Sequence, residues 1–225
     1  MRVTFLTAAN SKVSLTKTFK KDGTKSSYPN VKRFDSHEVT LPSDPLKALE
    51  VLEKSSKEYA AKGAAMLKGE TSPGAVLKNE SRKGFVDRIK MTNHIVLDID
   101  GLVLPNINPS TMTLDNNAIK FLAGLVVNQL PVEFQQISYV AMASSSLGVK
   151  PTINIHLHFL SSTPVRPKQL KEWLKQTNLD IQGLRDSCTL NATYKALSYT
   201  LDPCLADNSR MIYIGTPIFE NKSEN

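Results

Sequence analysis

The chain of 225 residues lacks several features that would identify a protein class at once. It has only two cysteines, Cys188 and Cys204, and no Cys-x-x-Cys pair, which excludes a disulfide framework and a zinc-finger type of site. No apolar run approaches about 18 residues, so no membrane-spanning helix is expected. The first ten residues carry one charge and a very short apolar stretch, which predicts that there is no secretory signal.

The composition excludes intrinsic disorder, because 40% of the residues are hydrophobic and 22% are charged. The charge is unevenly distributed. Residues 1–90 contain 18 basic and 10 acidic side chains, whereas residues 91–225 contain 10 basic and 11 acidic ones. This basic front half predicts a surface that faces a polyanion, with nucleic acid or a nucleotide as the leading class. A merely soluble, lysine-rich surface is the alternative explanation for the same charge.

The hydrophobic pattern predicts an α+β fold in one domain, 1–225, with a basic N-terminal α/β subdomain at 1–90 and a second subdomain at 91–225. Ser43-Asp44-Pro45 indicates a helix start, and Gly63 indicates its end. Residues 7–40 are polar and are predicted to be hairpin or loop. Later patterns predict strands over 94–101, 137–143, 152–160 and 211–214, and helices over 115–130, 164–176 and 191–201. In the second subdomain we expect the helices to pack on one face of the sheet.

Two acids mark the end of the apolar strand His94-Ile95-Val96-Leu97-Asp98-Ile99-Asp100-Gly101. Residues i and i+2 of a strand point to the same face, so the carboxylates of Asp98 and Asp100 project together. Two such charges repel each other unless a cation lies between them or one is protonated. Hard oxygen ligands of this kind suit Mg²⁺ or Mn²⁺, which in turn bind substrate phosphates. The alternative is an ordinary strand end followed by an Asp-Gly turn.

Two further segments carry polar side chains of the same kind. Asn154, His156 and His158 alternate along a predicted strand and therefore share one of its faces. Histidine beside a polyanion donates a hydrogen bond to phosphate or binds a metal. Asp202 precedes the last predicted strand, as a possible third carboxylate, and Arg210 has the geometry to hold a phosphate with two hydrogen bonds.

The order of these motifs resembles the archaeo-eukaryotic primase superfamily, the primase-polymerases, and within it the catalytic domains of phage and plasmid primases. Leu97-Asp98-Ile99-Asp100 resembles the first family motif, and Asn154-Ile155-His156 lies where the family usually has Ser-x-His. Ser144-Ser145-Ser146 is similar to the serine-rich turn upstream of that histidine. Leu201-Asp202-Pro203, with the strand after Arg210, is similar to the third motif. The resemblance covers roughly residues 60–220, and Asn154 departs from the family serine.

This resemblance implies a palm sheet like that of RNA-recognition domains, with a smaller N-terminal α/β unit. It implies template-directed nucleotidyl transfer, with two Mg²⁺ or Mn²⁺ ions held by Asp98, Asp100 and Asp202. His156 would contact the phosphates of the incoming nucleotide. The further implied contacts are those of Arg210, Ser145, Lys150 and Asn154 with the nucleotide, and those of Arg82 and Lys83 with DNA. The implied partners are a single-stranded DNA template, an NTP or dNTP, and a fused or separate helicase, in the cytoplasm of a bacterial host.

Three other functions remain open from the sequence. His156-Leu157-His158 is also a His-hydrophobic-His motif, as in relaxases and rolling-circle initiators, where a downstream helical tyrosine such as Tyr194 or Tyr199 attacks DNA. A haloacid dehalogenase-type phosphatase has a similar acidic strand, but that motif normally opens the domain. A non-catalytic nucleic-acid-binding module would need only the basic front half, and it leaves the paired acids unexplained.

Overall fold

The computed structural model describes residues 1–20, 24–69, 71, 75–191, 193 and 195–220. The chain forms two compact units, of which the first comprises Met1–Asp87 and Met211–Asn225 and the second comprises Arg88–Arg210. The boundary near residue 90 lies close to the predicted one. The C-terminal segment differs from the prediction, because it belongs to the first unit. Both units contain strands and helices, so the class is α+β, as predicted.

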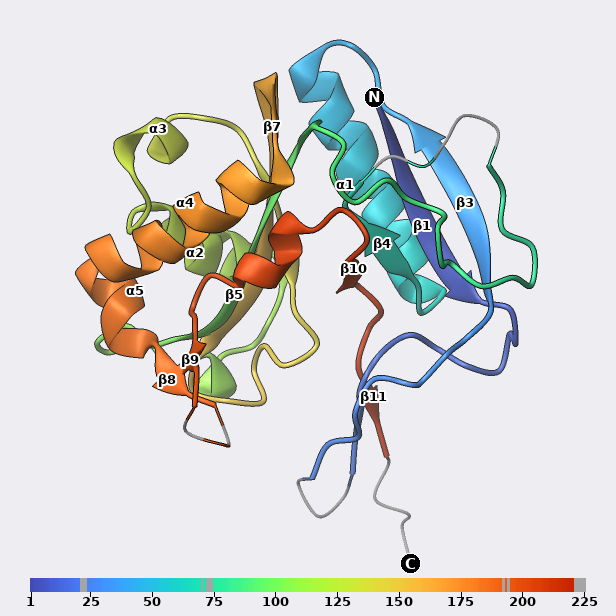
Figure 1. Ribbon diagram of the computed structural model, residues 1–225. Helices are drawn as coiled ribbons and strands as arrows, with labels where there is room; N and C mark the ends of the chain where they lie inside the picture. The colour runs from blue at the N-terminus through green and yellow to red at the C-terminus, as the bar shows by residue number, and fades with distance from the viewer. Residues whose placement is uncertain (21–23, 70, 72–74, 192, 194, 221–225) are drawn as a thin grey trace, which may run out of the picture. The chain divides into compact units, whose positions relative to one another are not determined.

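The first unit is built on an antiparallel sheet in the order β10-β4-β1-β3 (Figure 1). Its strands are β1 (Arg2–Ala8), β3 (Phe34–Thr40), β4 (Ala65–Leu67) and β10 (Met211–Tyr213), and a separate parallel pair joins β2 (Thr18–Phe19) to β11 (Ile218–Phe219). Helix α1 (Pro45–Ala61) begins after Asp44, whose carboxylate accepts a hydrogen bond from the Lys47 N–H at 2.8 Å. Tyr59 of α1 stacks on Phe5 of β1, with 4.4 Å between ring centroids. The predicted helix is therefore confirmed.

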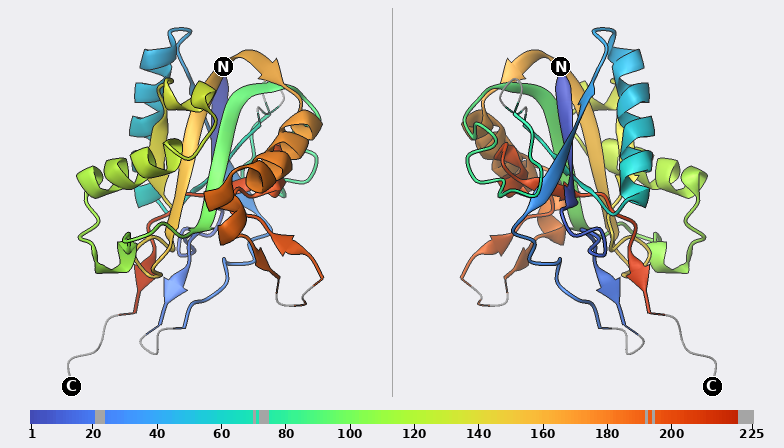
Figure 2. Two further views of the ribbon diagram at one scale, coloured as in Figure 1. Left: turned by 90° about the vertical axis from the view of Figure 1, so that its left-hand side faces the viewer. Right: turned by 90° about the vertical axis from the view of Figure 1, so that its right-hand side faces the viewer.

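The second unit is built on an antiparallel sheet in the order β5-β7-β6, with the long strands β5 and β7 side by side in both views of Figure 2. The strands are β5 (Thr92–Leu102), β6 (Val140–Ala143) and β7 (Ile153–Val165). The helices are α2 (Asn116–Val127), α3 (Val132–Gln135), α4 (Pro167–Asp180) and α5 (Gln182–Ser187), with 3₁₀ turns η1 (Pro109–Thr111) and η2 (Pro203–Ala206). All strands predicted between residues 94 and 160 are present.

One face of this second sheet forms the hydrophobic core of the unit. Leu97, Ile99 and Leu157 pack there with Leu122 of α2 and Leu174 of α4. Because side chains alternate between the faces of a strand, the residues between these core positions point to the opposite face. Burying the leucines and isoleucines of β5 and β7 under the helices therefore determines which face carries the two acids and the histidines.

One sequence prediction is wrong about local structure, and another is wrong about the partner of a strand. Of residues 191–201, those that the structure describes do not form the predicted helix: β8 (Thr189–Leu190) and β9 (Leu197–Ser198) pair as antiparallel strands. The side chain of Asn191 accepts hydrogen bonds from the N–H groups of Thr193 and Lys195, both at 3.2 Å, and this local bonding favours a turn over a helix. The strand at 211–214 is present as β10, but it pairs with β4 and not with the second sheet. A strand of three residues has no periodicity that indicates its partner.

Polar residues 7–40 also contain more regular structure than their pattern predicts. Strand β3 pairs with β1 along seven residues, from Phe34 opposite Ala8 to Thr40 opposite Arg2. The sequence of β3, Phe-Asp-Ser-His-Glu-Val-Thr, has few apolar side chains. Backbone hydrogen bonds to β1 thus define this edge strand, and a hydrophobic pattern cannot reveal them.

Candidate carboxylate site

The second sheet brings the third acid of the predicted triad beside the first two. On the edge of β5 opposite to β7, Ile99 forms an antiparallel bridge with Leu201. The Asp202 N–H donates to the Asp98 carbonyl at 3.0 Å, and the Asp100 N–H donates to the Thr200 carbonyl at 2.9 Å. Residues opposite each other in an antiparallel pair project to the same face. Asp202 therefore lies next to Asp98, although the two are far apart in the sequence.

The three acids line one cavity of about 340 Å³, here called the carboxylate cavity. Its wall also includes Lys171 and Lys175 from α4, and Tyr199 from the segment after β9. The lysines place positive charge next to the carboxylates. The three residues that the sequence predicts as metal ligands therefore line one cavity.

A side chain of α4 holds the segment that carries the third acid. Asn178 is buried, its amide donates to the Leu201 carbonyl at 2.9 Å, and its oxygen accepts from the Leu201 N–H at 2.8 Å. The same amide donates to the Leu174 carbonyl at 2.7 Å. These bonds tie Leu201, and with it the neighbouring Asp202, to the core of the unit. Sequence reasoning missed Asn178, because an asparagine inside a helix has no signal for such a distant contact.

The three carboxylates have different surroundings. An oxygen of Asp202 accepts the Cys204 N–H at 2.8 Å as the cap of η2, while Asp98 Oδ1 lies 3.2 Å from Nε2 of His156. Asp100 is exposed, and its side chain has no hydrogen-bond or ion-pair partner in the part of the chain that the structure describes. Burial raises the pKa of the Cys204 thiol, and Asp202 raises it further, whereas Arg210 and Lys171 lower it.

This set of side chains fits a divalent cation in the type and the number of its donors. Three carboxylates on one wall supply the hard oxygen ligands that Mg²⁺ and Mn²⁺ prefer, and a cation would offset their mutual repulsion. Within the described residues, no three histidine, cysteine, aspartate or glutamate side chains are placed so that they could already hold a metal ion together. The cavity is therefore an open set of oxygen donors and not a preformed cage.

The histidines of β7 divide into two different environments. His156 lies opposite Asp98 in the strand pairing and is buried beside it. His158 is fully buried, and its Nδ1 lies 3.0 Å from Nε2 of His94, so one ring donates a hydrogen bond and the other accepts it. Burial, with His94 and His156 nearby, lowers the pKa of His158 well below its ordinary value. His158 is thus a neutral structural residue, while His156 contacts the carboxylate cavity through Asp98.

Asn154 has a structural task in the fold. It is buried, and its oxygen accepts the N–H of Gly101 at 2.9 Å, while its amide donates to the Thr152 carbonyl at 2.8 Å. The β5–β7 pairing shifts register between Ile99 and Leu102, where Gly101 adopts a left-handed φ of 81°. Asn154 thereby supports the bend that directly follows Asp100. Its predicted contact with a nucleotide stays a prediction.

The other predicted residues do not line the carboxylate cavity. Ser145 is buried and Lys150 exposed in the turn after β6, where the Ser144 N–H donates to the Asn154 carbonyl at 3.1 Å. Arg210 is exposed, and its positive charge lowers the pKa of the Cys204 thiol, which itself lines the cavity. Arg82 and Lys83 belong to the first unit, and their DNA contact stays a prediction. Tyr194 lies outside the described residues.

Comparisons with known proteins give no match: no family model, no curated protein and no solved structure matches the chain. The resemblance to primase-polymerases therefore depends on the sequence motifs alone. No helix in the described residues is long and apolar enough to span a membrane.

Proposed function

We propose that this protein is a metal-dependent nucleotidyltransferase that copies a single-stranded DNA template, as a primase, a DNA polymerase or both. The observation that carries the proposal is the meeting of Asp98, Asp100 and Asp202 in one cavity beside two lysines. The primase-type fold is part of the proposal. The sheet β5-β7-β6, with helices on one face, would be the palm, and β1, β3, β4 and α1 would be the smaller N-terminal unit.

The chemistry of phosphoryl transfer needs mainly positioning and neutralisation of charge. Two Mg²⁺ or Mn²⁺ ions, when bound, would lower the pKa of the attacking hydroxyl and offset the negative charge of the leaving pyrophosphate. Asp98, Asp100 and Asp202 would hold these ions. Lys171 and Lys175, which line the same cavity, would contact the triphosphate, and this adds two residues to those predicted from the sequence.

His156 would act first on Asp98. With 3.2 Å between Nε2 and Oδ1, the ring can donate a hydrogen bond to the carboxylate and hold its orientation. A direct contact with the nucleotide phosphates remains the further prediction for this residue. The two roles are separable, because loss of an orienting contact weakens metal binding, whereas loss of a phosphate contact raises the KM for the nucleotide.

The decisive experiment is a primer-extension and de novo synthesis assay with labelled nucleotides, with Mg²⁺, with Mn²⁺ and with chelator. Wild-type protein should incorporate nucleotides only with a divalent ion. Asp98→Asn and Asp100→Asn should each lower synthesis by about 100-fold or more. The exposed Asp186, in the same unit, supplies the matched control Asp186→Asn, which should retain full activity. Synthesis in chelator, or full activity of either site variant, would contradict the proposal.

One observation favours a second candidate function, that of a His-hydrophobic-His nickase. Tyr199 lines the carboxylate cavity, as the attacking tyrosine of a His-hydrophobic-His nickase would. Against this, His158 is buried with one nitrogen engaged by His94, so the two histidines are not both directed to one ion in the cavity. A nickase would form a covalent adduct with single-stranded DNA, and Tyr199→Phe would abolish it. Absence of any adduct in the wild type excludes this activity.

The third candidate, a non-catalytic nucleic-acid-binding module, predicts binding that falls with salt and is indifferent to divalent ions. The same assay separates it from a polymerase, since it predicts no incorporation of nucleotides under any condition. The helicase partner and the bacterial, phage or plasmid setting belong to the primase proposal.

A further inference from the structure

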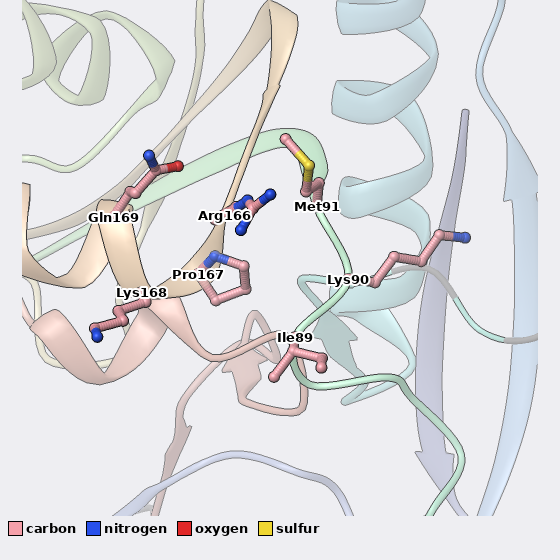
Figure 3. A pocket seen from close by; sticks show the side chains of 7 residues that line it. All are labelled: Ile89, Lys90, Met91, Arg166, Pro167, Lys168 and Gln169. Carbon is pink, nitrogen blue, oxygen red and sulfur yellow. The ribbon is translucent and has the colours of Figure 1, made fainter.

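A second cavity lies where β7 turns into α4 in the same unit. It has a volume of about 600 Å³, and its wall combines cationic with apolar side chains, among them Arg166, Lys168, Pro167, Ile89 and Met91 (Figure 3). We call it the basic cavity. Figure 3 shows Arg166 and Lys168 on opposite sides of Pro167, so the two charges flank an apolar surface.

The apolar wall of the basic cavity is held in place by polar contacts behind it. The guanidinium group of Arg88 donates hydrogen bonds to Asp207, and the amide of Asn208 donates to the Lys90 carbonyl at 2.7 Å. Both neighbours of Ile89 thus have polar partners in the segment 207–208, while Ile89 itself is 81% exposed. Together with Met91, which is 43% exposed, Ile89 presents apolar surface to the cavity.

Helix α4 connects the basic cavity with the carboxylate cavity. Lys168 lines the first, and Lys171 and Lys175 line the second. The spacing i, i+3, i+7 places these three lysines, the lysine row, along one face of the helix. The row spans roughly 10 Å of helical rise. Lys175 is partly neutralised by Glu172 at 3.2 Å, whereas Arg166 and Lys168 have no acidic partner among the described residues.

From this arrangement we infer that the basic cavity binds the sugar-phosphate backbone of single-stranded nucleic acid. The inference rests on the proposed function for one point, namely that the strand continues along the lysine row to the carboxylate cavity. Arg166 and Lys168 match two phosphodiester charges, and Ile89, Met91 and Pro167 offer apolar surface to an unstacked base or sugar. A lone phosphate needs no such apolar wall, and a single strand uses both charge and apolar contact. The first turn of α4 adds the positive end of a helix dipole to this site.

The test measures binding of a short fluorescein-labelled oligothymidylate by fluorescence anisotropy, in chelator, over a range of salt concentrations. The double variant Arg166→Ala/Lys168→Ala should bind about tenfold more weakly at low salt, and the slope of log K against log salt should be shallower by about 1.4. The variant Arg166→Lys/Lys168→Arg, which keeps both charges, should bind nearly as the wild type does. Lys120→Ala, an exposed lysine of α2 in the same unit, is the matched control and should leave affinity and slope unchanged.

Unchanged affinity and slope in the double alanine variant would overturn the inference. So would equal weakening by Lys120→Ala, because the binding would then be diffuse. Displacement of the oligonucleotide by dTTP would assign the cavity to a free nucleotide, and equal affinity for a duplex of the same length would remove the preference for single strands. Either result overturns the inference.

This experiment also separates the inference from the proposed function. It contains no divalent ion, and Asp98→Asn should bind the oligonucleotide as the wild type does. If the wild type does not synthesise nucleic acid but its oligonucleotide binding still depends on Arg166 and Lys168, only the proposed function is refuted. Normal synthesis by an alanine variant with unchanged oligonucleotide affinity would refute only the inference.

Discussion

The two cavities at the ends of the lysine row differ in how their charges are held. The carboxylate cavity gathers like charges from separate segments by backbone bonds: Asp202 is joined to Asp98, and Asp100 to Thr200. The basic cavity places Arg166 and Lys168 close together in sequence, at the start of one helix. Acids from distant segments come together only through the tertiary fold, whereas two cationic side chains two residues apart are brought together by one helix start. Changes to the fold should therefore disturb the arrangement of the three carboxylates more than that of Arg166 and Lys168, although the apolar wall of the basic cavity also comes from a distant segment.

Asp202→Asn is expected to give the largest difference between the two cavities, because it should affect the function of one and not of the other. Asparagine caps a helix start about as well as aspartate, so the η2 turn and the fold should persist. The third anionic ligand is lost, and metal-dependent synthesis should fall by about 100-fold or more. Oligonucleotide binding in chelator should stay as in the wild type. If synthesis survives, Asp202 has no place in the site.

The next largest effect is expected at Asn178, whose hydrogen bonds to Leu201 hold the segment that carries Asp202. Asn178→Ala leaves the buried backbone groups of Leu201 without their side-chain partner and should cost about 2–4 kcal/mol of unfolding free energy, measured by urea titration. At temperatures where the variant stays folded, synthesis should fall while oligonucleotide binding persists. Equal loss of both activities would show that the two cavities are not independently built.

The third prediction concerns the pH dependence of the unfolding free energy, to which the buried pair His94 and His158 contributes. Burial lowers the pKa of His158 in the folded state, so its stabilising effect is complete above the unfolded pKa, about 6.5, and is lost as the pH falls below it. The unfolding free energy should decrease by up to about 1.4 kcal/mol per pH unit in that range. In His158→Gln this dependence should become shallower. An equally steep dependence in the variant would assign it to other groups.

The smallest effect is expected at the polar contacts behind the basic cavity. Burial raises the pKa of Asp207, but hydrogen bonds from Arg88 and Ser209 outweigh this and lower the pKa to about 2. The contribution of Asp207 is therefore present above about pH 4 and is lost as the pH falls towards 2. Since the Arg88 side chain is 70% exposed, Arg88→Ala should lower Tm by no more than about 2 °C at neutral pH. The difference between variant and wild type should vanish near pH 2.

Sequence periodicity predicted most of the second unit, because its strands and helices bury continuous apolar faces. The alternation around Leu97 and Ile99 placed Asp98 and Asp100 on one face of a strand, and the alternation around Leu157 did the same for His156 and His158. The prediction of one helix over 191–201 was wrong, since side-chain bonds of Asn191 close a hairpin there.

Other parts of the site had no local signal in the sequence. Asn178 is an ordinary helical asparagine until the chain returns past it at Leu201, and Lys171 and Lys175 look like any exposed lysines. The different environments of His156 and His158 were also hidden, although the two residues share a motif and a strand face. They differ in their neighbours across the sheet, since His156 lies opposite Asp98 whereas His158 lies opposite Val96 and contacts His94.

The amino-acid sequence by itself determined the α+β class, the strand that carries the paired acids, and the position of both carboxylates on one face of that strand. These follow from alternation and composition, which act within a few residues. The tertiary structure alone decided that Asp202 joins the pair, that α4 adds two lysines to the same cavity, and that a basic cavity opens at the start of that helix. The physical reason is that hydrogen bonds and packing between distant segments are properties of the folded chain, and no local pattern encodes them.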